Sequence, residues 1–191
     1  MRGKQPCRDE HHMQPLIRFQ HLSKTYSRGQ KLAHAIVALD LEIAPGLVYG
    51  SLVRNSAGKT TAFRLLLGLM HATRGCAMLY GQDVSANPKV LSRVGALFED
   101  PGFYHFMSGR DNLRTLARTA GECATERVDR LLDQVGLEGR ADQRVSGYSK
   151  GMRQRLGVAA ALLGDPELNI LDEPTNGLDP QRGSGDRGLF S

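Results

Sequence analysis

Asn55-Ser56-Ala57-Gly58-Lys59-Thr60-Thr61 is the stretch of sequence that decides the fold. An apolar run, residues 47–53, precedes it, and an amphipathic run, residues 62–70, follows it. This order predicts a strand, a tight loop and a helix. Backbone N–H groups at such a junction are unpaired and point the same way, and the helix dipole adds partial positive charge. The junction is therefore suited to a phosphate group.

The side chains of this stretch fit a nucleoside triphosphate. Lys59 is expected to reach the β- and γ-phosphates, and the Thr60 hydroxyl to ligate Mg²⁺. The pattern resembles the Walker A loop, G-x-x-x-x-G-K-[ST], with Val53 at its first glycine and Ser56 at a further one. A non-glycine residue at positive φ costs about 1–3 kcal/mol, so strain is expected at both positions. The alternative is an ordinary strand, loop and helix with a chance Gly-Lys-Thr. The expected nucleotide-binding residues here are Asn55, Ser56, Ala57, Gly58, Lys59, Thr60 and Thr61.

The composition is that of one soluble globular domain. The 191 residues are 40% hydrophobic and 24% charged, enough for a sizeable core. The net charge of +5 is too small and too scattered to predict nucleic-acid binding. No apolar run is long enough for a membrane span. Because the three cysteines lie far apart, they predict neither a disulfide framework nor a zinc site.

Hydrophobic periodicity places further elements along the chain. Strands are expected at residues 16–19, 35–43, 76–80, 94–98 and 168–171, with Gly81 and Asp83 in a turn. Helices are expected at residues 62–70 and 109–120, from an N-cap at Thr125 to Gly136, and from Ser149 onward. The predicted core faces are Phe63, Leu66, Leu67 and Met70 in the first helix and Val128, Leu131, Leu132 and Val135 in the third.

Two further positions have the residue types of a phosphate-handling site. Ser149 starts a helix and brings a hydroxyl to its N-terminus, which is again suited to phosphate. Asp172 and Glu173 follow the buried strand expected at 168–171, where α/β sheets place their chemistry. Asp172 could hold Mg²⁺ through water, and Glu173 could orient or deprotonate an attacking water. The alternative for this pair is a solvated strand end.

Taken together, these residues resemble the nucleotide-binding subunit of an ATP-binding cassette (ABC) transporter. The run Tyr148–Met152, continuing to Gly157, resembles the L-S-G-G-Q signature, and Leu171–Thr175 resembles Walker B. Glu99 stands where the family has the Q-loop glutamine, and Asn176–Asp179 resembles the D-loop. The run Val94–Tyr104 is similar to exporters of the bacitracin and lantibiotic-immunity type, where an acidic residue often replaces that glutamine.

The resemblance implies a fold, a chemistry and partners. The fold is the α/β P-loop NTPase fold, with a mainly parallel sheet, an antiparallel N-terminal region and a helical signature subdomain. ATP and Mg²⁺ are the implied cofactors: Tyr26 would stack on adenine, Glu99 would offer oxygen to Mg²⁺ or water, and Glu173 would be the catalytic glutamate. In a sandwich homodimer, Ser149 and Gly151 would contact the ATP of the other subunit. Closure would drive a separate membrane permease from the cytoplasmic face of the membrane, with no nucleic acid involved.

The two ends of the chain depart from this resemblance. We expect a disordered tail at residues 1–14, an incomplete nucleotide-binding domain at 15–180 and an aberrant tail at 181–191. The family's switch histidine and the strand after Walker B have no counterpart, so the chain as written is expected neither to hydrolyse ATP nor to form a stable domain alone. Two other functions stay open: a cassette that binds nucleotide or a partner without turnover, and a cassette ATPase that acts on ribosomes or in DNA repair.

Overall fold

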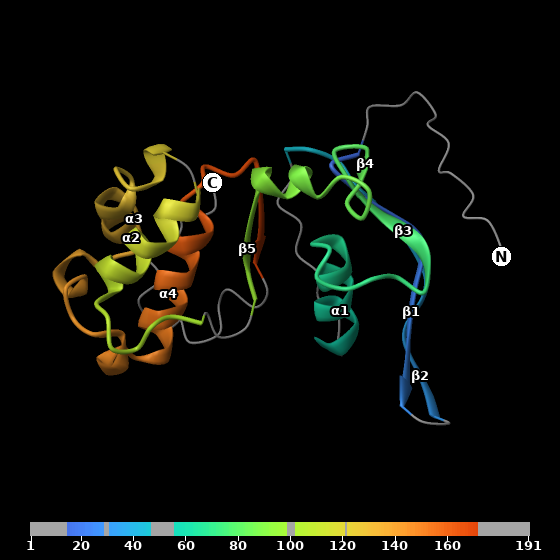
Figure 1. Ribbon diagram of the computed structural model, residues 1–191, viewed down its shortest axis with the longest axis horizontal. Coiled ribbons are helices and arrows are strands. Elements are labelled where there is room, and N and C mark those ends of the chain that lie inside the picture. Colours follow the sequence, from blue (N-terminus) through green and yellow to red (C-terminus); the bar gives the residue numbers. More distant parts are fainter. Residues whose placement is uncertain (1–14, 29–30, 47–55, 99–101, 121, 172–191) are drawn as a thin grey trace. The chain divides into compact units, whose positions relative to one another are not determined.

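The computed structural model describes residues 15–28, 31–46, 56–98, 102–120 and 122–171. The chain divides into two compact units, Met1–Pro88 and Lys89–Ser191. The first is built on an antiparallel sheet, and the second on three helices and a pair of parallel strands (Figure 1). The predictions for both tails and for a strand at 47–53 lie outside the described residues.

The sheet of the first unit has the strand order β2-β1-β3-β4, with every neighbouring pair antiparallel. Its strands are β1 (Ile17–Arg28), β2 (Lys31–Ile43), β3 (Arg74–Leu79) and β4 (Gln82–Asp83). The antiparallel N-terminal region is therefore confirmed. Its first two strands are longer than the sequence predicted, because they form one continuous hairpin. The turn predicted at Asp83 is wrong, since this residue pairs with Met78 in β4.

A bulge interrupts β1 beside Leu22, where its register shifts against both neighbouring strands. His21 has a φ of 46° there. Its backbone N–H donates to Asp40 Oδ1 of β2 at 2.7 Å, and its ring Nδ1 lies 2.8 Å from Asp40 Oδ2. On the other side, a Cβ at Gly75 of β3 would collide with the backbone oxygens of Gln20 and His21. The bulge is thus fixed by a carboxylate from one strand and by a glycine from the other.

Helix α1 (Ser56–Leu66) packs on β2 and β3 of this sheet. It ends where Gly68 adopts a φ of 67° and Leu69 N–H donates to Arg64 O at 2.9 Å, a Schellman arrangement. Of the predicted core face, Leu66 is buried, while Met70 lies beyond the end of the helix. Phe63 and Leu67 are half-buried, and the other buried positions among the described side chains of this helix are Thr61, Ala62 and Leu65. The predicted helix therefore exists, but it begins and ends earlier than the apolar pattern indicated.

The second unit matches its predicted elements closely. Strands β5 (Val94–Leu97) and β6 (Leu168–Leu171) pair in parallel, in a register that joins Leu97 to Leu171. Between these strands in the sequence come the helices α2 (Gly109–Ala120), α3 (Val128–Gln134) and α4 (Lys150–Ala161). The described residues also form short 3-10 turns: η1 (Pro88–Arg93), which begins at the last residue of the first unit, η2 (Glu122–Ala124), η3 (Glu138–Arg140) and η4 (Val145–Gly147). The β6 strand is less buried than predicted, since Asn169 is exposed and Ile170 is its buried residue.

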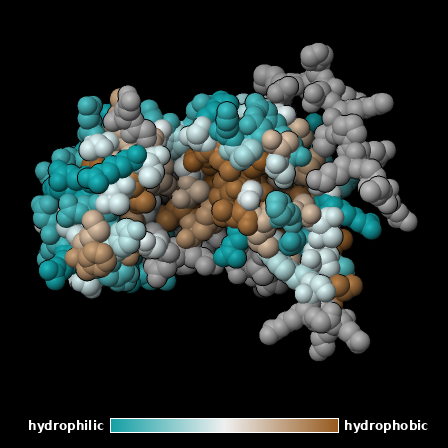
Figure 2. Space-filling view, in the orientation of Figure 1, coloured by the Kyte–Doolittle hydropathy of each residue, from teal (hydrophilic) through white to brown (hydrophobic). Residues whose placement is uncertain are grey.

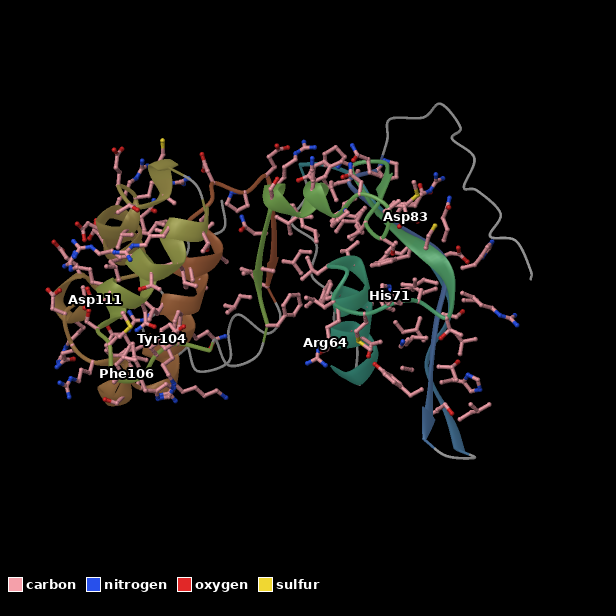
Figure 3. The ribbon with its side chains drawn as sticks, in the orientation of Figure 1. Arg64, His71, Asp83, Tyr104, Phe106 and Asp111 are labelled. Atoms are coloured by element: carbon pink, nitrogen blue, oxygen red, sulfur yellow. The ribbon has the colours of Figure 1, made fainter. Side chains whose placement is uncertain are left out.

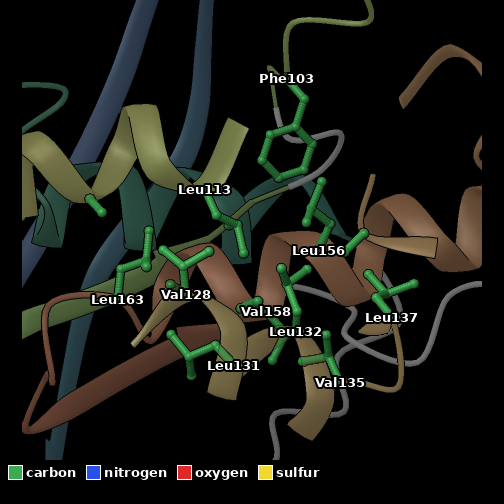
Figure 4. Close-up of a cluster of buried hydrophobic side chains, with 14 of the residues drawn as sticks. Phe103, Leu113, Val128, Leu131, Leu132, Val135, Leu137, Leu156, Val158 and Leu163 are labelled. Atoms are coloured by element: carbon green, nitrogen blue, oxygen red, sulfur yellow. The ribbon is translucent and has the colours of Figure 1, made fainter. Parts of the chain in front are cut away.

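The three helices enclose an apolar core (Figure 4). The predicted face of α3 is confirmed, because all four of its residues are at most 2% exposed. Gly136 ends this helix as predicted, with a φ of 65°. The N-cap predicted at Thr125 is wrong: Arg127 holds that position, and its side chain makes no capping hydrogen bond. On the face shown in Figure 2, the helices are covered mostly by hydrophilic residues. No helix among the described residues is long and apolar enough to span a bilayer.

Candidate functional site

The start of α1 has the properties that an anion requires. Gly58, Lys59, Thr60 and Thr61 lie in its N-terminal half, and its first turn contains no acidic side chain. The unpaired N–H groups and the dipole of a helix start both favour negative charge. Thr61 is buried, with 8% of its surface exposed, whereas Lys59 and Thr60 are half-buried. This arrangement fits a phosphate group at the helix start with Lys59 beside it.

Among the described residues, nothing packs against Gly58 closely enough to require a glycine. A Cβ at this position would lie 3.7 Å from the backbone oxygen of Ala35, an ordinary van der Waals contact. The absent side chain instead keeps the backbone of the first turn accessible, which is what the close approach of a phosphate needs. The residues present therefore fit the triphosphate group that the sequence predicted.

The strain predicted at Ser56 is wrong. Ser56 is the first residue of α1, and helical backbone is a conformation that serine adopts without strain. The other residue for which strain was predicted, Val53, lies outside the described residues, as does Asn55.

Tyr26, the predicted adenine platform, lies near the end of β1 and is 40% exposed. Its hydroxyl donates to Met70 Sδ at 3.6 Å. The ammonium of Lys24 lies over its ring, 5.4 Å from the centroid. The ring is thus exposed and at the same time held from two sides. Lys24 was not among the residues predicted for this site, although residues i and i+2 of a strand share one face.

Ser149 caps α4 as the sequence predicted. Its side-chain oxygen accepts a hydrogen bond from Met152 N–H at 3.2 Å, which fixes the hydroxyl over the first turn. A hydroxyl that accepts one bond can still donate its proton. Ser149 is exposed, Gly151 lies in the same turn, and no acidic residue is present there. This helix start is a second place suited to phosphate, within the second unit.

Tyr148 anchors the residue before this cap, and the sequence analysis did not predict its role. The side chain is buried, and its hydroxyl donates to the backbone oxygen of Arg140 at 2.7 Å. Its own backbone oxygen accepts a bond from Arg153 Nη1 at 2.7 Å. Burial, and to a smaller extent the charge of Asp142, raises the pKa of Tyr148. The phenol therefore stays protonated and acts as a donor at neutral pH.

The predicted acidic residues Glu99, Asp172 and Glu173 lie outside the described residues. The strands that lead to them end side by side, because Leu97 of β5 pairs with Leu171 of β6 in a parallel ladder. Within the part of the chain that is described, no three His, Cys, Asp or Glu side chains gather as metal ligands.

Comparison with known proteins decides the family. Residues 36–176 match the family model described as "ABC transporter". The chain belongs to the ABC transporter family. It is 43% identical to the bacitracin transport ATP-binding protein BcrA of Bacillus licheniformis, over 88% of this chain and 54% of that protein. It is 37% identical to the lantibiotic transport ATP-binding protein SrtF of Streptococcus pyogenes, over 86% of this chain and 69% of that protein.

The same family appears among solved structures. The ATP-binding cassette MJ0796, bound to ADP and Pi in a dimeric post-hydrolysis state, superposes with a TM-score of 0.76 at 21% identity. The match covers 91% of this chain and 80% of that one, and at this identity it shows the fold. The resemblance to ABC cassettes of the bacitracin and lantibiotic branch and the predicted P-loop NTPase fold are therefore confirmed. The chain spans about half the length of BcrA.

Proposed function

We propose that this ABC cassette binds and hydrolyses ATP and thereby powers a separate membrane-spanning exporter subunit. One observation carries the proposal. The start of α1 combines a lysine, two threonines and a glycine that the described residues do not crowd, and the exposed ring of Tyr26 lies in the same unit. The names of the two relatives, both transport ATP-binding proteins, support it.

The proposed site uses different residues for the nucleotide, for Mg²⁺ and for the attacking water. Lys59 and the backbone N–H groups of residues 55–61 hold the phosphates, and Tyr26 stacks on the base. Thr60, Asp172 and Glu99 would hold Mg²⁺, which would supply charge neutralisation on the phosphates. Glu173 orients or deprotonates the attacking water.

Ser149 and Gly151 are assigned to the nucleotide of a second copy of the chain. Their helix start is exposed and free of acidic residues, so it can approach a phosphate from outside. The contact with the permease is assigned to the Q-loop and to residues 102–120, which follow it in the sequence. Two exposed aromatic side chains in this segment, Tyr104 and Phe106, lie with ring centroids 5.7 Å apart (Figure 3). Such a pair suits a protein interface. The cassette would then lie at the cytoplasmic face of the membrane.

Titration calorimetry with Mg-ATP tests the nucleotide site. Lys59→Met removes the cation at the start of α1 and should weaken binding at least tenfold, since charge-assisted bonds to phosphate contribute about 1.5–3 kcal/mol. Arg64→Gln is the matched control, because Arg64 is an exposed cation on the same helix. It should bind like the parent. Equal affinity in the parent and Lys59→Met would remove the phosphate site from this helix.

Phosphate release separates turnover from binding. In a chain extended to the length of its relatives, Glu173→Gln should keep Mg-ATP affinity and lose most hydrolysis, as expected if Glu173 acts on the water. A second candidate, a cassette that binds nucleotide or a partner without turnover, is favoured by Val53 at the first Walker A glycine. A parent chain that binds Mg-ATP but releases no phosphate would establish this alternative.

A further inference from the structure

Four consecutive residues of β1, Ser23 to Tyr26, contact the segment that follows α1. Thr73 N–H donates to Ser23 O at 2.9 Å, and Thr25 N–H donates to Thr73 Oγ1 at 3.0 Å. Two side chains of β1 bond to the same segment: Lys24 Nζ donates to His71 O at 2.8 Å, and Tyr26 Oη donates to Met70 Sδ at 3.6 Å. His71 is labelled in Figure 3, where the segment crosses from α1 toward β3. The end of β1 is therefore held by the segment that connects α1 to β3.

Within this contact, Lys24 has two roles at once. Its ammonium is fixed by a backbone oxygen, and it lies 5.4 Å from the centroid of the Tyr26 ring. A cation at this distance from an aromatic face is attracted by the ring quadrupole. Because the Tyr26 hydroxyl is held at the ring's edge, both the position and the tilt of the ring are restricted before any ligand binds. Even so, 40% of the side chain stays exposed.

We propose that Lys24 is a positioning residue that holds the Tyr26 ring ready to stack on the nucleotide base. The proposal rests on the proposed function in one respect, that Tyr26 is the base platform. A ring fixed in advance loses less conformational freedom on binding. Lys24 then improves affinity for the base and does nothing for the phosphates, which Lys59 and the start of α1 hold.

The first test compares two ligands, Mg-ATP and inorganic tripolyphosphate with Mg²⁺, by titration calorimetry. Lys24→Met keeps the length of the side chain and removes its charge. It should weaken Mg-ATP binding roughly two- to fivefold, the range expected for one exposed cation–aromatic contact, and leave tripolyphosphate unchanged. Lys24→Arg should recover the parental affinity, since arginine keeps the charge over the ring. Arg64→Gln controls for the loss of one positive charge in the same unit.

Two results would overturn the proposal. Equal weakening of both ligands in Lys24→Met would make Lys24 a phosphate contact, and unchanged affinity for both would leave it with no role in binding.

A second measurement needs no nucleotide. The chain contains no tryptophan, so Tyr26→Trp introduces one fluorophore at the platform. Adding Lys24→Met to this variant should lower the steady-state anisotropy of the indole, because the ring gains motion. Unchanged anisotropy contradicts the positioning role. If the parent chain does not bind Mg-ATP, the proposed function fails, and the anisotropy comparison still decides whether Lys24 fixes the ring.

Discussion

The Tyr148 hydroxyl donates a hydrogen bond to the backbone oxygen of Arg140 at 2.7 Å. This bond fixes the residue that directly precedes the Ser149 cap of α4. Gly109, at the start of α2, lies against the same phenol, because a Cβ added there would collide with the hydroxyl oxygen. Tyr148 and Gly109 are therefore matched in shape, and the position of the cap depends on both.

Gly109→Ala should destabilise the chain by about 1–3 kcal/mol, the usual cost of overpacking. The sign of this change in the free energy of unfolding is informative, since glycine to alanine in an unobstructed helix would instead stabilise the chain by up to about 1 kcal/mol. Tyr148→Phe should cost about 1 kcal/mol through the lost hydrogen bond. Urea unfolding of both single variants and the double variant measures their coupling. The double variant should lose less unfolding free energy than the two single variants lose together, because phenylalanine lacks the oxygen that the new methyl group would contact. Additive costs would mean that the two positions do not interact.

Ser149 is predicted to have two separable roles. Ser149→Ala should lower the unfolding free energy by about 1 kcal/mol through loss of the cap. Ser149→Asp should keep that stability, because aspartate also caps helices, but its charge should repel the phosphate of a second copy. Light scattering with Mg-ATP, in a Glu173→Gln background, measures dimer formation. Dimers in the Ser149→Asp variant at the parental level would remove Ser149 from the nucleotide interface.

The two departures from the Walker A pattern should respond differently to glycine. Ser56 lies in a helical conformation, so Ser56→Gly should relieve no strain and leave Mg-ATP affinity unchanged or slightly lower. Val53→Gly should tighten binding if valine strains the loop before the helix. Calorimetry on the two single variants decides between them. Tighter binding by Ser56→Gly alone would show that the helical start of α1 is not the conformation that binds nucleotide.

Acid should weaken the second unit through Asp142. The hydrogen bond from Arg110 holds the pKa of Asp142 below its ordinary value, with Nε of Arg110 2.8 Å from Oδ1. A carboxyl with a lowered pKa adds stability above the pKa of the unfolded chain, about 4, and loses it as pH falls through the folded value. Asp142→Asn should therefore be less stable than the parent at pH 7, and this deficit should shrink as the pH falls below about 4.

Urea unfolding of parent and variant across this pH range provides the measurement. Asp133→Asn, which changes an exposed carboxylate of α3, is the control for net charge. A deficit in Asp142→Asn that stayed constant from neutral to acidic pH would contradict the role of the Arg110 pair.

The elements predicted best from the sequence are those whose determinants lie within one segment. The face of α3 repeats at helical spacing, Gly136 ends it with a positive φ, and Ser149 caps α4 through a neighbour three residues on. Gly58 to Thr61 were expected at the junction of loop and helix, and they lie inside α1, which begins at Ser56. In each case the residues that decide the structure are close in the chain, so pattern and propensity agree.

Most of the features that were missed depend on contacts with other segments of the chain. The outer half of β1 is polar and shows no alternation, and it becomes a strand because β2 pairs with it. Thr125 was a reasonable cap by residue type, yet α3 starts later. Lys24 and Tyr148 gain their roles from His71 and Arg140, contacts that no local pattern encodes.

The parallel pairing of β5 with β6 also bears on the order in which the chain folds. Bringing together two strands separated by roughly 70 unfolded residues would cost about 4 kcal/mol in loop-closure entropy. The intervening chain forms α2, α3 and α4 around their own core, so most of that loop becomes compact before the strands meet. Helices assemble quickly from local contacts, whereas a parallel strand pair cannot form without closure. We therefore expect the three helices to fold first and to bring β6 next to its partner, β5.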